Sequence, residues 1–175
     1  ISNTYDYSGG YLKHAEEEIK DFLSGIQSVL FIPYALVNRD DYAKEAEDYF
    51  KRLGIKVSSI HNSKNPKKAV SEAQAIYIGG GNTFRLLSEL YKVGIVDLLR
   101  ERIVEGMPYI GSSAGVNIAS PTIRTTNDMP IVDPRGLVTP FFDGWSVDAW
   151  IITANFSLVP SRCPDARQKL DMDGG

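Results

Sequence analysis

The sequence predicts an α/β fold in three layers, in which a parallel β-sheet carries helices on both of its faces. In the first two thirds of the chain, short apolar runs alternate with stretches whose apolar residues recur at helical spacing. Two glycine-rich turns, at residues 79–82 and 111–115, each follow an apolar run directly. Such turns lie at the carboxyl ends of parallel strands, where α/β sheets carry their functional sites.

These patterns give the elements in chain order. Residues 1–3 have the composition of a strand end, and residues 11–23 place their apolar side chains on one helical face. Gly54 provides a C-terminal cap for one helix, Pro66 lies in the first turn of another, and Pro121 ends the last. The other expected strands are 28–32, 55–60, 75–78 and 108–110, and the other expected helices are 40–53, 66–73, 83–91, 95–105 and 113–119.

The pattern weakens toward the C-terminus. We interpret residues 125–133 as an ordered polar loop and residues 147–156 as a further strand or a short helix. Residues 160–175 contain the proline, the charges and the Gly-Gly end that are typical of a poorly ordered tail. The expected division is therefore an incomplete α/β domain over residues 1–136 and a divergent segment over residues 137–175.

Composition limits the classes of function. A chain of 175 residues accommodates one domain, and a net charge of −3 gives no electrostatic basis for binding nucleic acid. No apolar run approaches the ~20 residues that span a bilayer, and there is no signal peptide, although the chain begins with Ile1 rather than Met. The single cysteine, Cys163, excludes an internal disulfide framework and favours a reducing, cytoplasmic compartment. We expect neither a nucleic-acid nor a membrane partner.

Residues 111–115, with the sequence GSSAG, fit the G-x-S-x-G pattern between a predicted strand and a predicted helix. A sharp strand-to-helix turn forces the central residue, Ser113, into a strained conformation that exposes its hydroxyl, and side chains at the flanking positions would clash with the backbone. The backbone N–H of Ala114, at the start of the helix, can then bind a developing oxyanion. The competing interpretation is a plain glycine-rich turn, because this short pattern also arises by chance.

Residues 79–82, with the sequence GGGN, form the second turn, in which the Gly81 N–H can supply a second oxyanion donor. A turn that only needs positive φ angles is the alternative. The run matches neither the dinucleotide-binding fingerprint nor the P-loop, so no nucleotide cofactor is expected, and no metal site is expected either.

A serine nucleophile needs a base, and the chain has two histidines. His14 belongs to the first predicted helix, whereas His61 ends a predicted strand at the correct edge of the sheet, although a satisfied surface histidine is the commoner case. In the polar loop, Asp128 and Asp133 can shape a binding site or cap turns. Arg124 can bind a substrate carboxylate or pair with an acidic neighbour. Cys163 has no histidine near it in the sequence, so we do not expect a nucleophile there.

Three longer runs make the sequence similar to the peptidase E, or aspartyl dipeptidase, family of serine peptidases. They are IGGGNTFRLL at residues 78–87, YIGSSAG at residues 109–115 and PTIRTTNDMPIV at residues 121–132. Residues 1–3 and 30–35 also resemble that family, and the resemblance covers residues 1–136. It implies a fold related to the class I glutamine amidotransferases and the hydrolysis of short peptides that have an N-terminal aspartate.

The resemblance also implies roles for individual residues. Ser113 matches the nucleophile, and Gly81 and Ala114 match the donors of the oxyanion hole. It implies no cofactor, a small Asp-X peptide as substrate, and a homodimer as a further expectation. The expected substrate-binding residues are Asn82, Arg124, Thr126, Asn127 and Asp128.

The resemblance fails where the family has its histidine base, downstream of the nucleophile. Asn155 stands at that position, and an amide cannot accept the serine proton. The family's late glutamate also has no match, so residues 137–175 represent divergence or truncation. The alternative function is therefore an inactive peptidase E-like protein that only binds a peptide or a partner chain. A different hydrolase or amidotransferase of the same fold would need a cysteine at the elbow, but residue 113 is serine.

Overall fold

The computed structural model describes residues 10–120, 123 and 126–132. Strands and helices alternate along this part of the chain, as the hydrophobic pattern predicts. The elements are η1 (Lys13–Ala15), α1 (Glu16–Phe22), β1 (Ser28–Ile32), α2 (Arg39–Arg52), β2 (Lys56–Ser59), η2 (Ile60–Asn62), α3 (Pro66–Ser71), β3 (Ile76–Ile78), α4 (Thr83–Val93), α5 (Val96–Val104), β4 (Tyr109–Gly111) and α6 (Ala114–Ile118).

The four strands form one parallel sheet in the order β2-β1-β3-β4. The chain moves from β1 to one side for β2 and to the other side for β3, so the strand order reverses between β1 and β3. Ile32 of β1 pairs with Ile78 of β3, which pairs with Gly111 of β4, so these three strands end at the same level. The loops that follow them therefore meet at one edge, beside the point where ligands of open α/β sheets bind.

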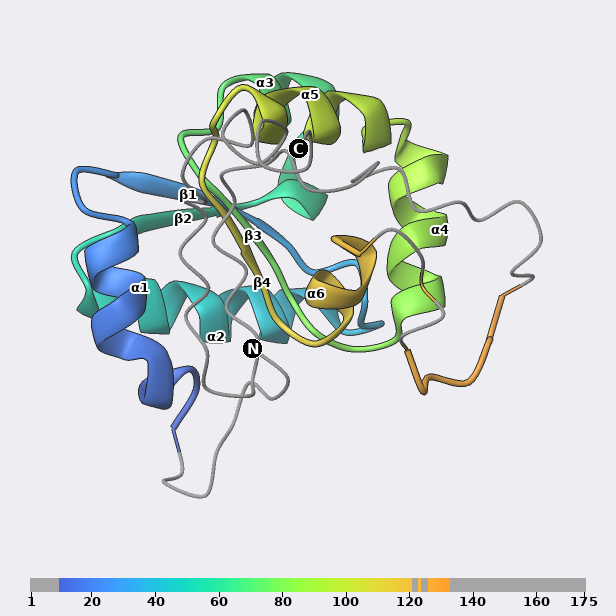
Figure 1. The fold of residues 1–175 in the computed structure, drawn as a ribbon, viewed down its shortest axis with the longest axis horizontal. Helices are drawn as coiled ribbons and strands as arrows, with labels where there is room; N and C mark the ends of the chain where they lie inside the picture. The colour runs from blue at the N-terminus through green and yellow to red at the C-terminus, as the bar shows by residue number, and fades with distance from the viewer. Residues whose placement is uncertain (1–9, 121–122, 124–125, 133–175) are drawn as a thin grey trace, which may run out of the picture.

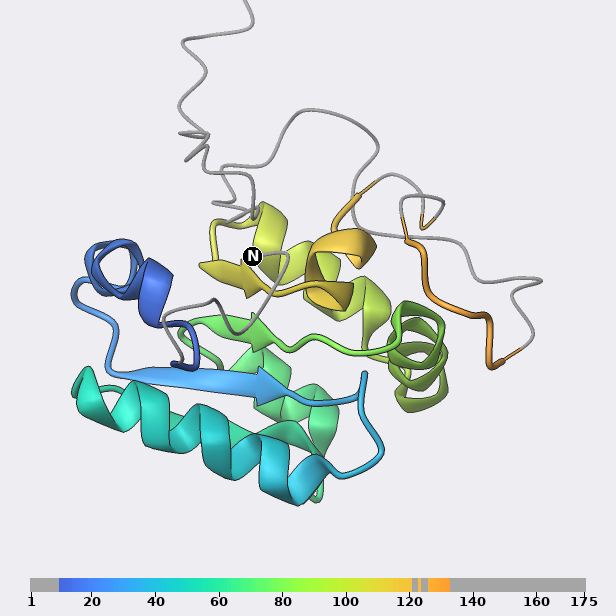
Figure 2. The ribbon, with the colours of Figure 1, turned by 90° about the horizontal axis from the view of Figure 1, so that it is seen from below.

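Each face of the sheet has its own core, because side chains alternate along a strand. Leu30 and Ile32 of β1 belong to the core that is covered by α3, α4, α5 and α6. Val29 and Phe31 point to the opposite face and pack with residues of α1 and α2. Figures 1 and 2 show the sheet between these two layers of helices. The predicted three-layer α/β architecture is confirmed.

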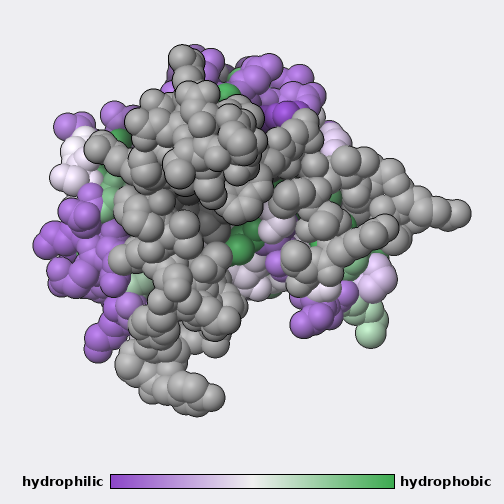
Figure 3. Space-filling view, viewed as in Figure 1, coloured by the Kyte–Doolittle hydropathy of each residue, from purple (hydrophilic) through white to green (hydrophobic). Residues whose placement is uncertain are grey.

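Asparagine and glycine set several helix ends in the way that capping chemistry predicts. The side chains of Asn38, Asn65 and Asn82 accept a backbone N–H in the first turns of α2, α3 and α4, respectively. Gly94 ends α4 with φ 69°, and Gly54 follows α2 with φ 77°. The helices are amphipathic, and Figure 3 shows hydrophilic side chains over the outer surfaces at the left and at the top, where Figure 1 places α1 and where it places α3 and α5, respectively.

The structure changes some predicted boundaries. The helix expected over residues 11–23 begins with the 3-10 turn η1, because Ala15 leaves the helical region with φ −122°. The strand expected over residues 55–60 ends at Ser59, and η2 follows. The last strand extends to Gly111, and α6 begins at Ala114 rather than at residue 113. The predictions for residues 1–3 and for residues 133–175 lie outside the described residues.

No helix in the described part of the chain is long and apolar enough to cross a membrane.

Candidate active site

The two glycine-rich turns lie side by side at the carboxyl edge of the sheet, because β3 and β4 are paired. The Ser112 N–H donates to the carbonyl of Ile78 at 3.0 Å, which fixes the start of the second turn against the end of β3. A Cβ atom built on Gly80 would lie only 3.1 Å from the Cβ of Ser113. The turn after β3 therefore lies directly against Ser113.

The backbone of Ser113 adopts a conformation that serine rarely takes. Its dihedral angles are φ 46° and ψ −105°, at the point where β4 turns into α6. Leu12 is the only other non-glycine residue with positive φ among the described residues. Such a conformation costs about 1 to 3 kcal/mol and persists only where the surroundings enforce it. The partly exposed Ser113 has the geometry of the nucleophile elbow that the sequence predicts.

The glycines that flank the elbow are required by close backbone contacts. A Cβ on Gly111 would meet the carbonyl carbon and oxygen of Gly115 at 2.8 and 2.9 Å. A Cβ on Gly115 would collide with the carbonyl oxygen of Ile78 and lie 3.2 Å from its carbonyl carbon. The backbone atoms of a strand and of a helix cannot move aside as a flexible side chain does. The sequence-based explanation of these two glycines is therefore confirmed.

Two backbone N–H groups beside Ser113 have no hydrogen-bond partner among the described residues. One belongs to Ala114, the first residue of α6, and the other belongs to Gly81 in the turn after β3. Gly81 has φ 135°, and a Cβ there would lie 2.7 Å from the carbonyl oxygen of Ala35, so only glycine fits. Its neighbours are engaged, since Gly80 N–H donates to the Tyr42 hydroxyl at 2.7 Å and Asn82 N–H donates to Ala35 at 3.1 Å.

Asn82 connects the same turn to the polar loop after α6. Its Oδ1 accepts the N–H of Arg85 at 3.0 Å and so caps α4. Its Nδ2 donates to the carbonyl of Met129 at 2.8 Å. Asn82 therefore holds residues 126–132 against the N-terminus of α4.

Thr83 is the centre of a second set of contacts with the loop. Its backbone N–H donates to Asp128 Oδ2 at 2.6 Å, and its Oγ1 lies 3.1 Å from Thr126 Oγ1. Asn117 Nδ2 of α6 donates to the same Oγ1 at 3.2 Å. The Asp128 N–H donates to Thr126 Oγ1 at 3.1 Å. Thr83 is fully buried, so a polar network joins α4, α6 and the loop.

The electrostatics of the loop centre on Asp128. Partial burial raises its pKa, but the hydrogen bonds from Thr83 and Thr126 lower it by more, so the pKa lies below its ordinary value. A charged carboxylate at the first residue of α4 is also favoured by the helix dipole. Asp128 is therefore ionised at neutral pH and stabilises the loop as well as the helix.

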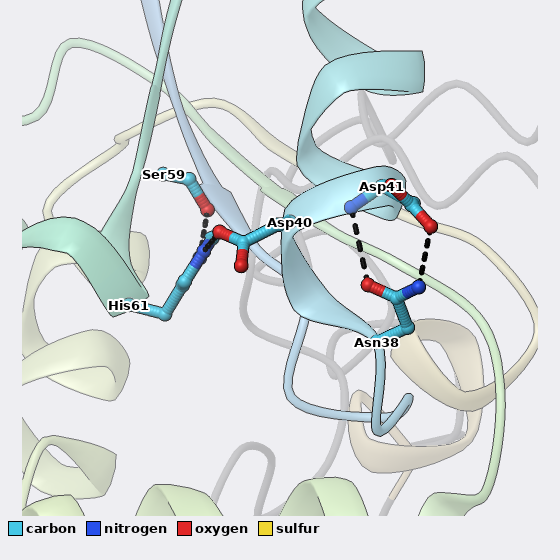
Figure 4. Close-up of polar contacts among 5 residues, drawn as sticks. All are labelled: Asn38, Asp40, Asp41, Ser59 and His61. Atoms are coloured by element: carbon cyan, nitrogen blue, oxygen red, sulfur yellow. Dashed lines mark hydrogen bonds and ion pairs between the residues drawn. The ribbon is translucent and has the colours of Figure 1, made fainter.

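The candidate histidines lie elsewhere. Nδ1 of His61 is 2.7 Å from Ser59 Oγ, and its Nε2 is 3.0 Å from Asp40 Oδ1 (Figure 4). Because β1 and β3 lie between β2 and β4, about 14 Å separates β2, which precedes His61, from β4, which precedes Ser113. His61 connects the end of β2 to the start of α2 through these two hydrogen bonds, and it does not contact Ser113. His14 lies in η1, on the face covered by α1 and α2.

The remaining predicted site residues are placed as follows. Thr126 and Asp128 lie in the network around Thr83, and Asn127 is exposed beside them. Arg124, Asp133 and Asn155 fall outside the described residues. In the part of the chain that the structure describes, no group of three or more His, Cys, Asp or Glu side chains could hold a metal ion.

Sequence reasoning did not identify Thr83, Asn117 or Tyr42 as parts of this site. Thr83 follows the cap residue Asn82, so its position at a helix N-terminus was a usable signal. Asn117 and Tyr42 gave no such signal, because Asn117 lies in a short helix and Tyr42 has the pattern of an ordinary core residue of α2.

Comparison with known proteins agrees with this geometry. The model of peptidase family S51 matches residues 1–162. "Peptidase E" of Streptomyces coelicolor is 42% identical over 139 residues, which are 79% of this chain and 57% of that protein. "Probable alpha-aspartyl dipeptidase" of Drosophila melanogaster is 42% identical over 137 residues, which are 77% of this chain and 57% of that protein.

A solved structure from Listeria monocytogenes EGD-e, titled "Putative Peptidase E Protein", superposes with a TM-score of 0.64 at 30% identity. The superposition covers 75% of this chain and 72% of that one. The chain spans a little more than half the length of the curated relatives that it matches. The family match covers most of the sequence and includes both glycine-rich turns, so the chain belongs to peptidase family S51.

Proposed function

We propose that this chain has the nucleophile and oxyanion hole of a serine-type dipeptidase that hydrolyses peptides with an N-terminal aspartate. The observation that carries the proposal is the backbone of Ser113, with φ 46° and ψ −105°. It is held between two glycines that admit no side chain, beside the N–H groups of Gly81 and Ala114, which have no hydrogen-bond partner among the described residues. This combination presents a hydroxyl together with two donors for a developing negative charge.

The proposed reaction is acyl transfer to Ser113. Its Oγ attacks the scissile carbonyl carbon while the hydroxyl proton passes to water. The π electrons move to the carbonyl oxygen, and the N–H groups of Gly81 and Ala114 stabilise that oxygen. When the tetrahedral intermediate collapses, the C–N bond breaks and the leaving amine takes up a proton. Water then hydrolyses the acyl-enzyme and restores the serine. No cofactor takes part in this scheme.

The name of the Drosophila melanogaster relative, "Probable alpha-aspartyl dipeptidase", supports an aspartyl peptide as the substrate. We assign substrate contacts to the polar loop and to the turn after β3. Asn82 and Asp128 shape the site through the bonds that fix the loop, whereas the exposed Asn127 has its amide available for the peptide. The further residues assigned to substrate binding are Arg124 and Thr126.

Binding without turnover is the second candidate, and one observation favours it. Both histidines of the chain, His14 and His61, precede Ser113, and the family resemblance puts Asn155 at the position of the base. Loss of one triad member commonly lowers the rate by several orders of magnitude, while the oxyanion hole retains some catalysis. The proposed function therefore predicts slow hydrolysis of Asp-Leu by this chain, whereas the second candidate predicts binding of Asp-Leu with no hydrolysis.

The test compares the full chain with Ser113→Ala. We expect faster hydrolysis of Asp-Leu by the first than by the second, as well as one covalent label on Ser113 from a fluorophosphonate reagent, read by mass spectrometry. Equal hydrolysis by the two proteins would exclude Ser113 as the nucleophile. Saturable binding of Asp-Leu in calorimetry, with neither hydrolysis nor labelling, would support the binding protein instead.

We further infer a cytoplasmic location and a homodimer. The location is supported by a single cysteine, which suits a reducing compartment. Light scattering of the purified chain tests the dimer, and a monomeric mass at micromolar concentration would contradict it.

A further inference from the structure

Three tyrosines from separate parts of the chain form a buried cluster beneath the two turns of the candidate site. Tyr11 precedes η1, Tyr42 belongs to α2 and Tyr77 belongs to β3. Their exposed fractions are 6%, 7% and 0%, respectively. The hydroxyls of Tyr11 and Tyr77 are 2.9 Å apart, and the rings of Tyr11 and Tyr42 meet edge to face at 6.4 Å. The cluster lies in the core between the sheet and α2.

Two members of the cluster contact the two turns. The Tyr42 hydroxyl accepts the backbone N–H of Gly80 at 2.7 Å, in the turn that carries the Gly81 donor. The Tyr77 hydroxyl is 3.3 Å from the Oγ of Ser112, the residue before the nucleophile, whose side chain is fully buried. The tyrosine cluster therefore contacts both glycine-rich turns, the first through Tyr42 and the second through Tyr77.

The contact of Tyr42 with the first turn is also steric. A Cβ on Gly79 would lie 2.5 to 2.7 Å from the hydroxyl oxygen and ring carbons of Tyr42. The phenol ring therefore packs directly on the backbone at Gly79, and its hydroxyl holds the next N–H. The N–H of Gly80 is bound to Tyr42 and the N–H of Asn82 to Ala35, whereas the N–H of Gly81 between them has no partner among the described residues.

We propose that Tyr42 and Tyr77 are positioning residues, which set the Gly81 N–H relative to Ser113 through their hydroxyl contacts with Gly80 and Ser112. The proposal rests on the proposed function for its kinetic consequence, but its structural part is independent of turnover. An oxyanion hole works only when its donors are already placed where charge develops, and small displacements reduce the rate strongly. Burial, followed by the neighbouring Tyr42 hydroxyl, raises the pKa of Tyr77, so the Tyr77 hydroxyl stays protonated at working pH.

The experiment uses Tyr42→Phe and Tyr77→Phe in the full chain, since each removes one oxygen and keeps the ring. Tyr49→Phe is the matched control. Tyr49 is buried in the same core and also lies in α2, but its hydroxyl donates to the carbonyl of Leu12 at 3.4 Å, away from both turns. For Asp-Leu hydrolysis we expect kcat to fall by about tenfold or more in Tyr42→Phe and Tyr77→Phe, with KM unchanged. The control keeps both constants.

A second measurement separates this proposal from the proposed function. Backbone amide signals of Gly81 and Ser113 are recorded by NMR in the wild type and in the three variants. We expect these signals to shift in Tyr42→Phe and Tyr77→Phe and to stay in place in Tyr49→Phe. If the wild type does not hydrolyse Asp-Leu, the proposed function fails, while the shifts still support positioning. Unchanged Gly81 and Ser113 signals in folded Tyr42→Phe would overturn the inference, whatever the activity.

Discussion

The carboxylate of Asp128 accepts the backbone N–H of Thr83 at 2.6 Å, so the polar loop after α6 is bound to the first residue of α4. Asn82 adds a second connection, because it caps α4 and also donates to Met129 of the loop. The turn that carries Gly81 immediately precedes these residues. The contacts of Asn82 and Thr83 therefore fix the polar loop, cap the N-terminus of α4 and hold the turn that carries Gly81 in the candidate active site.

Asp128→Ala should lower the free energy of unfolding by about 1 kcal/mol. The substitution leaves the Thr83 N–H without its acceptor at a helix N-terminus, which resembles the loss of a capping residue. Urea denaturation of the two proteins measures the difference. Asp128→Asn is the control, since its amide oxygen can still accept the Thr83 N–H. This variant should therefore lose less than half of the free energy of unfolding that Asp128→Ala loses. Equal losses in both variants would mean that the charge, rather than the hydrogen bond, stabilises the loop.

The contribution of Asp128 should also depend on pH. Its pKa in the folded protein is lowered, so ionised Asp128 stabilises the fold above the unfolded-state pKa of about 3.9, and this stability is lost as the pH falls through the folded value. The stability difference between the wild type and Asp128→Asn should therefore shrink when the pH decreases from about 6 to about 3. Urea unfolding at several pH values in this range provides the measurement. A difference that stays constant with pH would contradict the assignment.

The elements that the sequence predicted correctly are those with local causes. Ser113 lies between two glycines after an apolar run, and both the strand and the turn follow from those few residues. The cap at Asn82 has the same local origin.

The contacts that the sequence did not predict join distant segments. Thr83 and Asp128 are 45 positions apart, and the contact of Tyr42 with Gly80 spans 38 positions. The hydrophobic pattern shows only that Tyr42 faces the core, and its hydroxyl partner depends on the strand order. The strand order also explains the position of His61, which lies at the correct edge of the sheet but on the far side from Ser113.

Gly115→Ala should destabilise the protein by about 3 kcal/mol or more, although alanine normally stabilises a helix relative to glycine. The sign reverses because the new methyl group would collide with the carbonyl of Ile78 in the central sheet. Thermal and urea unfolding test this expectation. Gly25→Ala is a suitable comparison, because a Cβ atom on Gly25 would meet no atom of the described residues within 4 Å. Only the positive φ of 82° opposes alanine there, so the loss of stability should be about 1 to 2 kcal/mol. A neutral or stabilising Gly115→Ala would contradict the close packing of α6 on β3.

Ser113→Gly should raise the free energy of unfolding by about 1 kcal/mol while it removes the nucleophile. Glycine tolerates φ 46° and ψ −105°, so the strain is released, and the flexibility of glycine in the unfolded chain offsets part of the gain. Ser113→Ala keeps the Cβ atom and should show no such gain. Urea denaturation of the two variants beside the wild type decides the matter. If alanine stabilises as much as glycine, backbone strain at the elbow is not the cause.

Asn155→His should raise kcat for Asp-Leu by about 100-fold or more, because an imidazole can accept the proton of Ser113 whereas an amide cannot. The position follows from the family resemblance, which puts the base at residue 155. The pH–rate profile should gain a rise near pH ~6.5, the ordinary pKa of histidine. Asn155→Ala serves as the control for a change of side chain without a base, and the combination Asn155→His with Ser113→Ala should remain inactive. A rate gain that survives in this double variant would show that the new histidine acts without Ser113, and no gain in the single variant would show that residue 155 is not the position of the base.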